Sequence, residues 1–215
     1  MIDSKIYNYN YEELVEWLEN CGSSNPDYFS AKKSGGLKLQ QVPYEYAKLL
    51  LFFKDKKIKR YLELGIGNGG SFITNCFFMQ ENLETALAVD DLSYGELIRQ
   101  NDIEINSFIE NIAPCLPEQA LIKFINSNTH TFFQNYKSDK FDCIFIDADH
   151  GYEGVKRDYQ NSLKHILKGG HIVFHDIASV NCEGVRRIWQ EVKKVHSKSY
   201  EFIHGTNCGI GIIEI

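Results

Sequence analysis

Short strand-like runs alternate with amphipathic helical segments along most of this 215-residue sequence, and the alternation limits the possible folds more than any other feature. Such a chain forms a mainly parallel sheet with helices on both faces, because right-handed crossovers return each helix to the sheet. Runs of β-branched and aromatic residues between turn residues predict strands at residues 60–64, 86–90, 121–125, 141–147, 171–176, 200–204 and 210–215. The sequence therefore predicts an α/β fold with a doubly wound, seven-stranded sheet.

The segments between these strands carry helical patterns. One predicted apolar face holds Val155, Tyr159, Ser162, Leu163, Ile166 and Leu167, and another holds Val185, Ile188, Trp189, Val192 and Val195. A capping-box pattern from Ser93 to Glu96 predicts the start of a further helix, which ends before Pro114. Residues 205–209 are too few for a helical crossover, so the last two strands are expected to pair antiparallel.

The N-terminal part of the chain has a different character. Residues 11–18 and 42–53 predict two helices, and the Gly-, Ser- and Lys-rich segment between them, residues 25–41, is expected to be a loop or lid. We therefore expect a helical extension or lid over residues 1–55 and a ligand-binding domain over residues 56–215.

A glycine-rich turn follows the first predicted strand. Gly65, Gly67 and Gly69 give the spacing G-x-G-x-G, whereas Gly70 in place of Gly69 gives G-x-G-x-x-G. Glycines at such a turn permit positive φ and let the backbone approach a ligand closely. The second spacing is that of dinucleotide-binding proteins, so the glycines leave an NAD-dependent oxidoreductase open, and an ordinary strand-to-helix turn also fits.

Two acidic residues favour a different cofactor. Asp90 ends the second predicted strand, where a carboxylate can bind the ribose hydroxyls of an adenosine. Glu63 lies two residues before the first glycine, where it suits the cationic amino-acid end of S-adenosylmethionine and would repel a pyrophosphate. The alternative is that Glu63 is a solvent-facing strand residue. The antiparallel final pair is also more typical of a methyltransferase than of a dehydrogenase.

Longer motifs resemble the class I S-adenosylmethionine-dependent methyltransferase superfamily. They are E-L-G-I-G-N-G-G-S at residues 63–71, V-D at 89–90, F-I-D-A-D-H-G-Y-E-G-V at 145–155 and L-K-G-G-H-I-V-F-H-D at 167–176. The segment 145–155 is most similar to the family with the I-D-G-D-H-S-Y-E signature, which has the layout of macrocin and catechol-type O-methyltransferases. The resemblance implies a Rossmann-like sheet of order 3-2-1-4-5-7-6 with the last strand antiparallel.

The turn and the resemblance together imply a set of cofactor-binding residues. These are Glu63, Gly65, Gly67, Asn68, Gly69, Ser71, Asp90, Ser127, Asn128 and Asp147. The chain departs from the family after the third strand, where relatives often have G-D-S with the acid near the adenine amino group. Here the residues are Asn126, Ser127 and Asn128, so adenine would be bound by a hydrogen bond from Ser127 or Asn128.

The ends of the fourth and fifth predicted strands carry the groups that methyl transfer needs. The reaction is an in-line displacement, helped by alignment of the partners and by removal of the acceptor proton. Neighbouring strands lie roughly 5 Å apart, so Asp147 can converge with His175 and Asp176. We expect Asp147, His150 and His175 to be catalytic, with His150 as general base because imidazole titrates near neutral pH.

Resemblance to metal-dependent catechol-type and sugar O-methyltransferases implies a further role for this edge. Asp147, His175 and Asp176 would then bind Mg²⁺ or another divalent cation. Without a metal, Asp147 would cap a helix or face the cofactor, and His175 would be a hydrogen-bonded pocket residue.

Composition limits the acceptor and the setting. A formal charge of −6 argues against a nucleic-acid partner, because such binding requires a basic face. No apolar run is long enough to span a membrane, no secretory signal is visible, and the six scattered cysteines are expected to be reduced. We expect a cytoplasmic enzyme that methylates a small-molecule or sugar hydroxyl and that can form a homo-oligomer. The competing hypotheses are an NAD-binding oxidoreductase and a non-catalytic ligand-binding protein.

Overall fold

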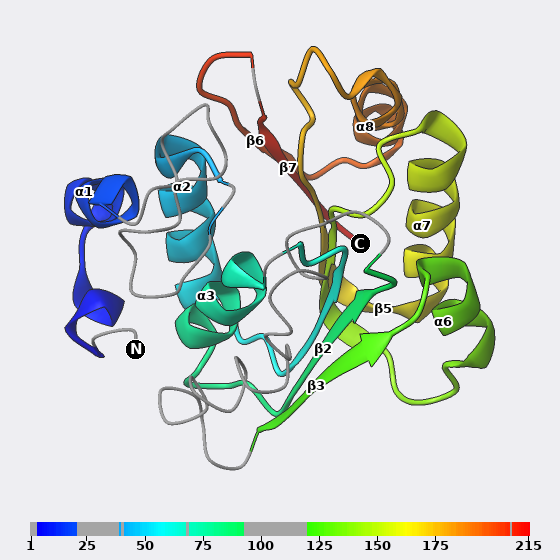
Figure 1. Ribbon diagram of the computed structural model, residues 1–215, viewed down its shortest axis with the longest axis horizontal. Coiled ribbons are helices and arrows are strands. Elements are labelled where there is room, and N and C mark those ends of the chain that lie inside the picture. The colour runs from blue at the N-terminus through cyan, green and yellow to red at the C-terminus, as the bar shows by residue number, and fades with distance from the viewer. Residues whose placement is uncertain (1–3, 21–38, 40, 68, 93–119, 207) are drawn as a thin grey trace.

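A single seven-stranded sheet forms the centre of the molecule (Figure 1). The computed structural model describes residues 4–20, 39, 41–67, 69–92, 120–206 and 208–215. The strands are β1 (Arg60–Leu64), β2 (Thr85–Asp90), β3 (Leu121–Asn126), β4 (Phe141–Ile146), β5 (Ile166–Phe174), β6 (Ser199–Phe202) and β7 (Ile210–Glu214). Their order, β3-β2-β1-β4-β5-β7-β6, confirms the predicted fold class and topology.

The strand pairing places β1 and β4 side by side in the middle of the sheet. β1 pairs parallel with β2 and β4, and the parallel set continues outward to β3 and β5. β7 is antiparallel to β6, as the short connection predicted, and to β5, as the family resemblance implied. The carboxyl ends of β1 to β5 therefore share one edge, and the strand order reverses between β1 and β4. Open α/β sheets bind their ligands at such a switch point.

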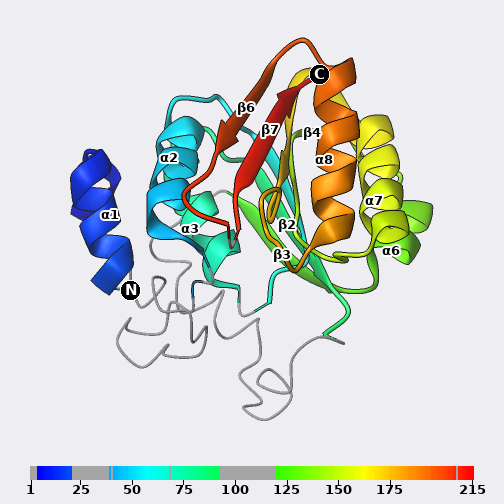
Figure 2. The ribbon, with the colours of Figure 1, turned by 90° about the horizontal axis from the view of Figure 1, so that it is seen from above.

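Helices cover both faces of the sheet (Figure 2). On one face lie α1 (Tyr11–Asn20), α2 (Pro43–Lys54) and α3 (Gly70–Phe78), and on the other lie α6 (Thr129–Asn135), α7 (Tyr152–His165) and α8 (Glu183–Val195). A 3-10 helix, η1 (Ser4–Asn8), precedes α1. Strand β1 shows how two apolar layers arise, because Tyr61 packs in the layer of α2 and α3 whereas Leu62 and Leu64 pack in the layer of α7 and α8.

Helix α2 shares its core with the sheet. Tyr46, Leu49, Leu50 and Phe53 of this helix have no exposed surface and pack in the same cluster as Tyr61 of β1. The predicted boundary at residue 55 therefore falls within one hydrophobic core. A separate role for residues 1–55 stays a prediction.

The predicted helical faces were wrong at their carboxyl ends. Ile166 and Leu167 do not belong to α7, which ends at His165, because Ile166 begins β5 and pairs with Phe141 of β4. Leu163 and Leu167 are 36% and 39% exposed, and Val195, predicted on the buried face of α8, is 74% exposed. Apolar residues near a helix end fit the helical and the strand period equally, so the pattern does not mark where burial stops.

The strands predicted at residues 141–147 and 171–176 extended too far at their carboxyl ends. β4 ends at Ile146 and β5 at Phe174, so Asp147, His175 and Asp176 lie in the loops just beyond. Asp176 has a φ of 63°, a left-handed conformation that no strand accepts. The helix predicted from Ser93 lies outside the described residues, as does most of the segment 25–41.

Two expectations from composition can be compared with the described residues. The cysteines in these ranges, Cys76, Cys143, Cys182 and Cys208, are free thiols and are buried, and their burial was predicted; Cys21 and Cys115 lie outside them. None of the described helices combines the length and the apolar character that a bilayer crossing requires.

Candidate active site

The glycine-rich turn links the end of β1 to the start of α3. Gly65, Gly67 and Gly69 have φ values of 77°, 49° and 79°, all in the left-handed region that favours glycine. A Cβ on Gly65 would lie 2.2 Å from the carbonyl oxygen of Asp147, so the turn also needs glycine to pack against the end of β4. Asn68 lies outside the described residues.

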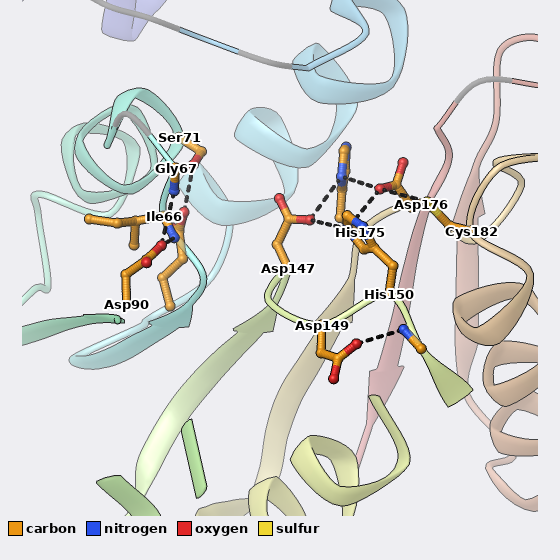
Figure 3. A network of polar contacts seen from close by, with 12 residues as sticks. Ile66, Gly67, Ser71, Asp90, Asp147, Asp149, His150, His175, Asp176 and Cys182 are labelled. Carbon is orange, nitrogen blue, oxygen red and sulfur yellow. Dashed lines mark hydrogen bonds and ion pairs between the residues drawn. The ribbon is translucent and has the colours of Figure 1, made fainter. Parts of the chain in front are cut away.

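Asp90 holds this turn in place (Figure 3). Its Oδ2 accepts hydrogen bonds from the backbone N–H groups of Ile66 at 2.9 Å and Gly67 at 3.3 Å. Its Oδ1 accepts a third bond from the N–H of Leu92 at 2.7 Å. The sequence predicted a ribose-binding role for Asp90 and gave no sign of this contact with the turn. Asp90 therefore ties the end of β2 to the glycine turn.

Glu63 is buried beneath the start of α3 and has no exposed surface, so its alternative interpretation as a solvent-facing residue was wrong. Its carboxylate accepts hydrogen bonds from Ser71 Oγ at 2.5 Å, from Asn75 Nδ2 at 3.2 Å and from the Tyr61 hydroxyl. Burial raises the pKa of Glu63 to about 7, although these hydrogen bonds oppose the rise. Glu63 therefore supports Ser71 and the start of α3 from below.

The loops after β4 and β5 bring four ionisable side chains together (Figure 3); the strand-end argument predicted three of them, those of Asp147, His175 and Asp176. His175 Nδ1 lies 3.1 Å from Asp147 Oδ1 and 3.5 Å from Asp176 Oδ2. His150 Nε2 lies 3.3 Å from Asp176 Oδ2 and 3.8 Å from Asp147 Oδ1. The two imidazoles thus bridge the same pair of carboxylates.

The two histidines differ in their exposure to solvent, whereas the pKa of each is raised. The side chain of His175 is only 6% exposed, whereas that of His150 is 41% exposed. Burial alone would lower the pKa of His175, but Asp147 and Asp176 raise it well above its usual range. The neighbouring carboxylate of Asp147 raises the pKa of His150 as well, although burial opposes the rise. His175 is therefore the buried histidine whose charged form the two carboxylates favour, and His150 is the one exposed enough to meet a substrate.

The motif around His150 is built from close backbone contacts. Asp149 Oδ1 accepts a hydrogen bond from the Gly151 N–H at 2.7 Å, and a Cβ on Gly154 would lie 2.0 Å from Asp149 Oδ2. The Tyr152 hydroxyl contacts Glu191 at 3.1 Å, so this ring faces α8 rather than the strand ends. The Asp-x-Asp-His-Gly-Tyr-Glu-Gly segment therefore fixes the loop that presents His150.

Ser127 and Asn128 lie just beyond β3, at the same edge of the sheet. The Ser127 N–H donates to the Asp90 carbonyl at 3.1 Å, which places this loop beside the end of β2. Asn128 caps α6, because its Oδ1 accepts a hydrogen bond from the Thr131 N–H at 2.8 Å. Part of the hydrogen-bonding capacity of Asn128 is thus used within the chain.

One residue of this region carried no sequence signal. Glu45, at the start of α2, is buried and accepts hydrogen bonds from the backbone N–H groups of His204 at 2.6 Å and Gly209 at 2.7 Å. It thereby holds the loop between β6 and β7 on the α2 side of the strand-end cluster. These partners are about 160 residues apart in sequence, and no local pattern could join them.

The donor set at the strand ends does not suit Mg²⁺, which takes oxygen ligands in a near-octahedral arrangement. A nitrogen of His175 lies between the two carboxylates that would hold such an ion. Among the described residues, two groups have ligand atoms within 4.8 Å of one another: His150 with Asp176 and Cys182, and His175 with Asp176 and Cys208. Asp147 joins neither group, and both groups contain a thiol.

Comparison with known proteins identifies the family. A profile of the methyltransferase domain family matches residues 62–177, which is more than half of the chain. The chain therefore belongs to this family. The match favours the methyltransferase over the oxidoreductase that the glycine spacing alone left open.

Individual relatives are distant. An uncharacterized protein of Acanthamoeba polyphaga mimivirus is 25% identical over 122 residues, 54% of this chain and 50% of that protein, so the match spans half of its length. The O-methyltransferase from Bacillus cereus in complex with SAH is 17% identical with a TM-score of 0.60, covering 100% of this chain and 92% of that one. The N-methyltransferase NodS from Bradyrhizobium japonicum is 15% identical with a TM-score of 0.56, covering 81% and 98%. These structures share the fold, which serves oxygen and nitrogen acceptors alike.

Proposed function

We propose that the chain transfers the methyl group of S-adenosylmethionine to a hydroxyl group of a small molecule or sugar. The observation that carries the proposal is the position of Asp147. Its backbone N–H donates to the Leu64 carbonyl at 2.8 Å, directly before the glycine turn, and its carboxylate contacts the two histidines. A cofactor in the turn and a base at the strand ends would therefore meet at Asp147.

In the proposed reaction, the acceptor oxygen forms a bond to the methyl carbon as the carbon–sulfur bond breaks, and the electron pair of that bond stays on sulfur. The acceptor proton moves to Nε2 of neutral His150. Asp176 and Asp147, 3.3 and 3.8 Å from this nitrogen, stabilise the imidazolium that forms. Burial alone would raise the pKa of Asp176, but the neighbouring His175 lowers it below its usual range. The products are a methyl ether and S-adenosylhomocysteine.

The proposed cofactor site runs along the carboxyl edge from β3 to β4. Asp90 binds a ribose hydroxyl through Oδ1, whose remaining acceptor site its three backbone hydrogen bonds leave unused, and Ser127 or Asn128 binds adenine. The turn, through Gly65, Gly67 and Gly69, contacts the amino-acid end together with Asp147. Glu63 does not contact the cofactor directly, because its side chain has no exposed surface. It acts through its hydrogen bond with Ser71.

A hydroxyl acceptor is supported by the base and by charge. The exposed imidazole of His150 can deprotonate a hydroxyl, and the two carboxylates beside it stabilise the positive charge that the imidazole then carries. The same carboxylates repel a phosphate backbone, and the chain carries a formal charge of −6. A small neutral or cationic molecule with a hydroxyl group therefore suits this site better than a nucleic acid does.

Calorimetric titration tests the cofactor site. S-adenosylmethionine should bind the wild-type chain, whereas NAD titrated in parallel should not, and binding should be lost in Asp90→Ala and Gly67→Val. Asp139→Asn is a matched control, because Asp139 is an exposed carboxylate before β4, at the opposite edge, paired with Arg60 at 3.4 Å. Unchanged binding in both site variants would contradict the assignment.

The base is tested separately, by formation of S-adenosylhomocysteine with a panel of hydroxyl acceptors. His150→Gln should bind the cofactor as the wild type does, yet react roughly 10²–10⁴-fold more slowly. A non-catalytic protein would bind the cofactor and show no turnover with any acceptor, and full activity of His150→Gln would exclude His150 as the base.

A further inference from the structure

A thiol lies against Asp176, one of the two carboxylates at the strand ends (Figure 3). Cys182 Sγ is 3.5 Å from Oδ2 of Asp176, and His150 Nε2 is 3.3 Å from the same oxygen. The ligand atoms of these three residues all lie within 4.8 Å of one another. Thiolate, imidazole and carboxylate are ligands that Zn²⁺ accepts together, whereas Mg²⁺ and Ca²⁺ prefer oxygen alone.

The spacing of these atoms also suits such an ion. Nitrogen, oxygen and sulfur ligands at about 2.0–2.3 Å from a tetrahedral ion are about 3.3–3.6 Å from one another. The two contacts with Asp176 Oδ2, at 3.3 and 3.5 Å, fall in this range. Two of the three ligand-to-ligand distances therefore match those around one ion, and the third, between His150 and Cys182, is no more than 4.8 Å.

The fold holds this arrangement through backbone packing. Cys182 directly precedes α8, and Gly184 in the first turn of that helix packs against the loop that carries His150. A Cβ on Gly184 would lie 2.4 Å from the His150 carbonyl oxygen and 2.3 Å from the Tyr152 nitrogen, so glycine permits the approach. The exposed side chain of His150 leaves the group open to solvent on one side, where an ion can enter.

We propose that His150, Asp176 and Cys182 form a binding site for a divalent ion of the zinc type, one that accepts nitrogen and sulfur ligands. The inference concerns the acceptor end of the proposed active site and rests on the proposed function only for its effect on turnover. A bound ion occupies Nε2 of His150, the nitrogen that must take the acceptor proton. Zinc binding and general-base catalysis are therefore mutually exclusive, and the ion inhibits methyl transfer.

Cobalt is the probe for this site, because Co²⁺ replaces Zn²⁺ and its spectrum reports the ligands. Titrating the full chain with Co²⁺ should produce visible bands of a four-coordinate ion and a near-ultraviolet thiolate-to-cobalt band, and Zn²⁺ should displace both. Cys182→Ser should abolish the thiolate band. His150→Gln should weaken Co²⁺ binding by more than the roughly 10–100-fold that loss of an outer-shell partner costs.

Cys208→Ser is the matched comparison, because Cys208 is another buried thiol and belongs to the second group near Asp176. It should keep the thiolate band. Absence of any thiolate band in the wild type, or loss of the band in Cys208→Ser but not in Cys182→Ser, would overturn the proposal. If Cys182→Ser fails to fold by circular dichroism, His150→Gln carries the test, and unchanged Co²⁺ affinity in that variant would overturn the proposal too.

These measurements separate the metal site from the proposed function, since the cobalt spectrum requires neither cofactor nor acceptor. A thiolate band without methyl transfer would support the site and refute the function. Methyl transfer without the thiolate band would support the function and refute the metal site. With both present, added Zn²⁺ should lower turnover and a chelator should restore it.

Discussion

At the residue scale, Glu63 shows how far a local pattern reaches. Its place two residues before Gly65 predicted an acid at the floor of the site, and Tyr61 shares its strand face by the two-residue period. The pattern could not show that Ser71 and Asn75 of α3 would close over the carboxylate, because this depends on how α3 packs on β1. The strand-end acids were easier to predict, since neighbouring parallel strands must end side by side.

The buried carboxyl group of Glu63 should make stability fall as pH rises. Its pKa is about 7 in the folded chain against 4.5 for an exposed glutamate, so folding favours the protonated form. This contribution is fully present below pH 4.5 and is lost as pH rises through about 7, a difference of roughly 3 kcal/mol. Denaturant unfolding at pH 5 and pH 8 should show Glu63→Gln losing this pH dependence.

The control for that experiment is Glu153→Gln, which changes an exposed acid in the first turn of α7. It should keep the wild-type slope of stability against pH. An equal slope in Glu63→Gln and wild type would mean that another group titrates with folding.

At the element scale, the connection between α2 and the β6–β7 loop is the feature that no pattern predicted. The helix itself was expected over 42–53 and is found at Pro43–Lys54, but its first turn carries a buried acid. Glu45 serves two backbone N–H groups of a loop that only the folded sheet brings near. Element existence follows from periodicity, whereas contacts between distant elements follow from topology and packing.

Glu45→Gln should destabilise the chain and loosen the β6–β7 loop. The amide has one oxygen to accept a hydrogen bond, so one of the two N–H groups, of His204 or Gly209, loses its partner. A buried unsatisfied donor costs about 1–3 kcal/mol. The free energy of unfolding should fall by that amount, and hydrogen exchange should quicken at His204 or Gly209. Glu16→Gln, on the exposed side of α1, should change neither, and slow exchange at both amides in Glu45→Gln would refute this role.

At the scale of the whole molecule, two halves of the sheet meet where β1 pairs with β4. The strand order came from the resemblance and the antiparallel end from a short loop, and both are confirmed. Neither the resemblance nor the short loop could show how closely the two halves of the sheet approach each other. The absence of a side chain at Gly65 permits the close approach, because the backbone after β1 lies directly against the backbone after β4.

Gly65→Ala compared with Gly205→Ala should separate this close approach from backbone strain. The two glycines have similar φ values, 77° and 82°, but a Cβ at position 65 would meet Asp147 at 2.2 Å, whereas at position 205 it would meet nothing within 4 Å. Gly205→Ala should therefore lower the free energy of unfolding by about 1–2 kcal/mol, the cost of a left-handed alanine. Gly65→Ala should lower it by about 4 kcal/mol or more, because β1 and β4 must move apart. Denaturant unfolding measures both, and equal losses would show that strain alone requires glycine at residue 65.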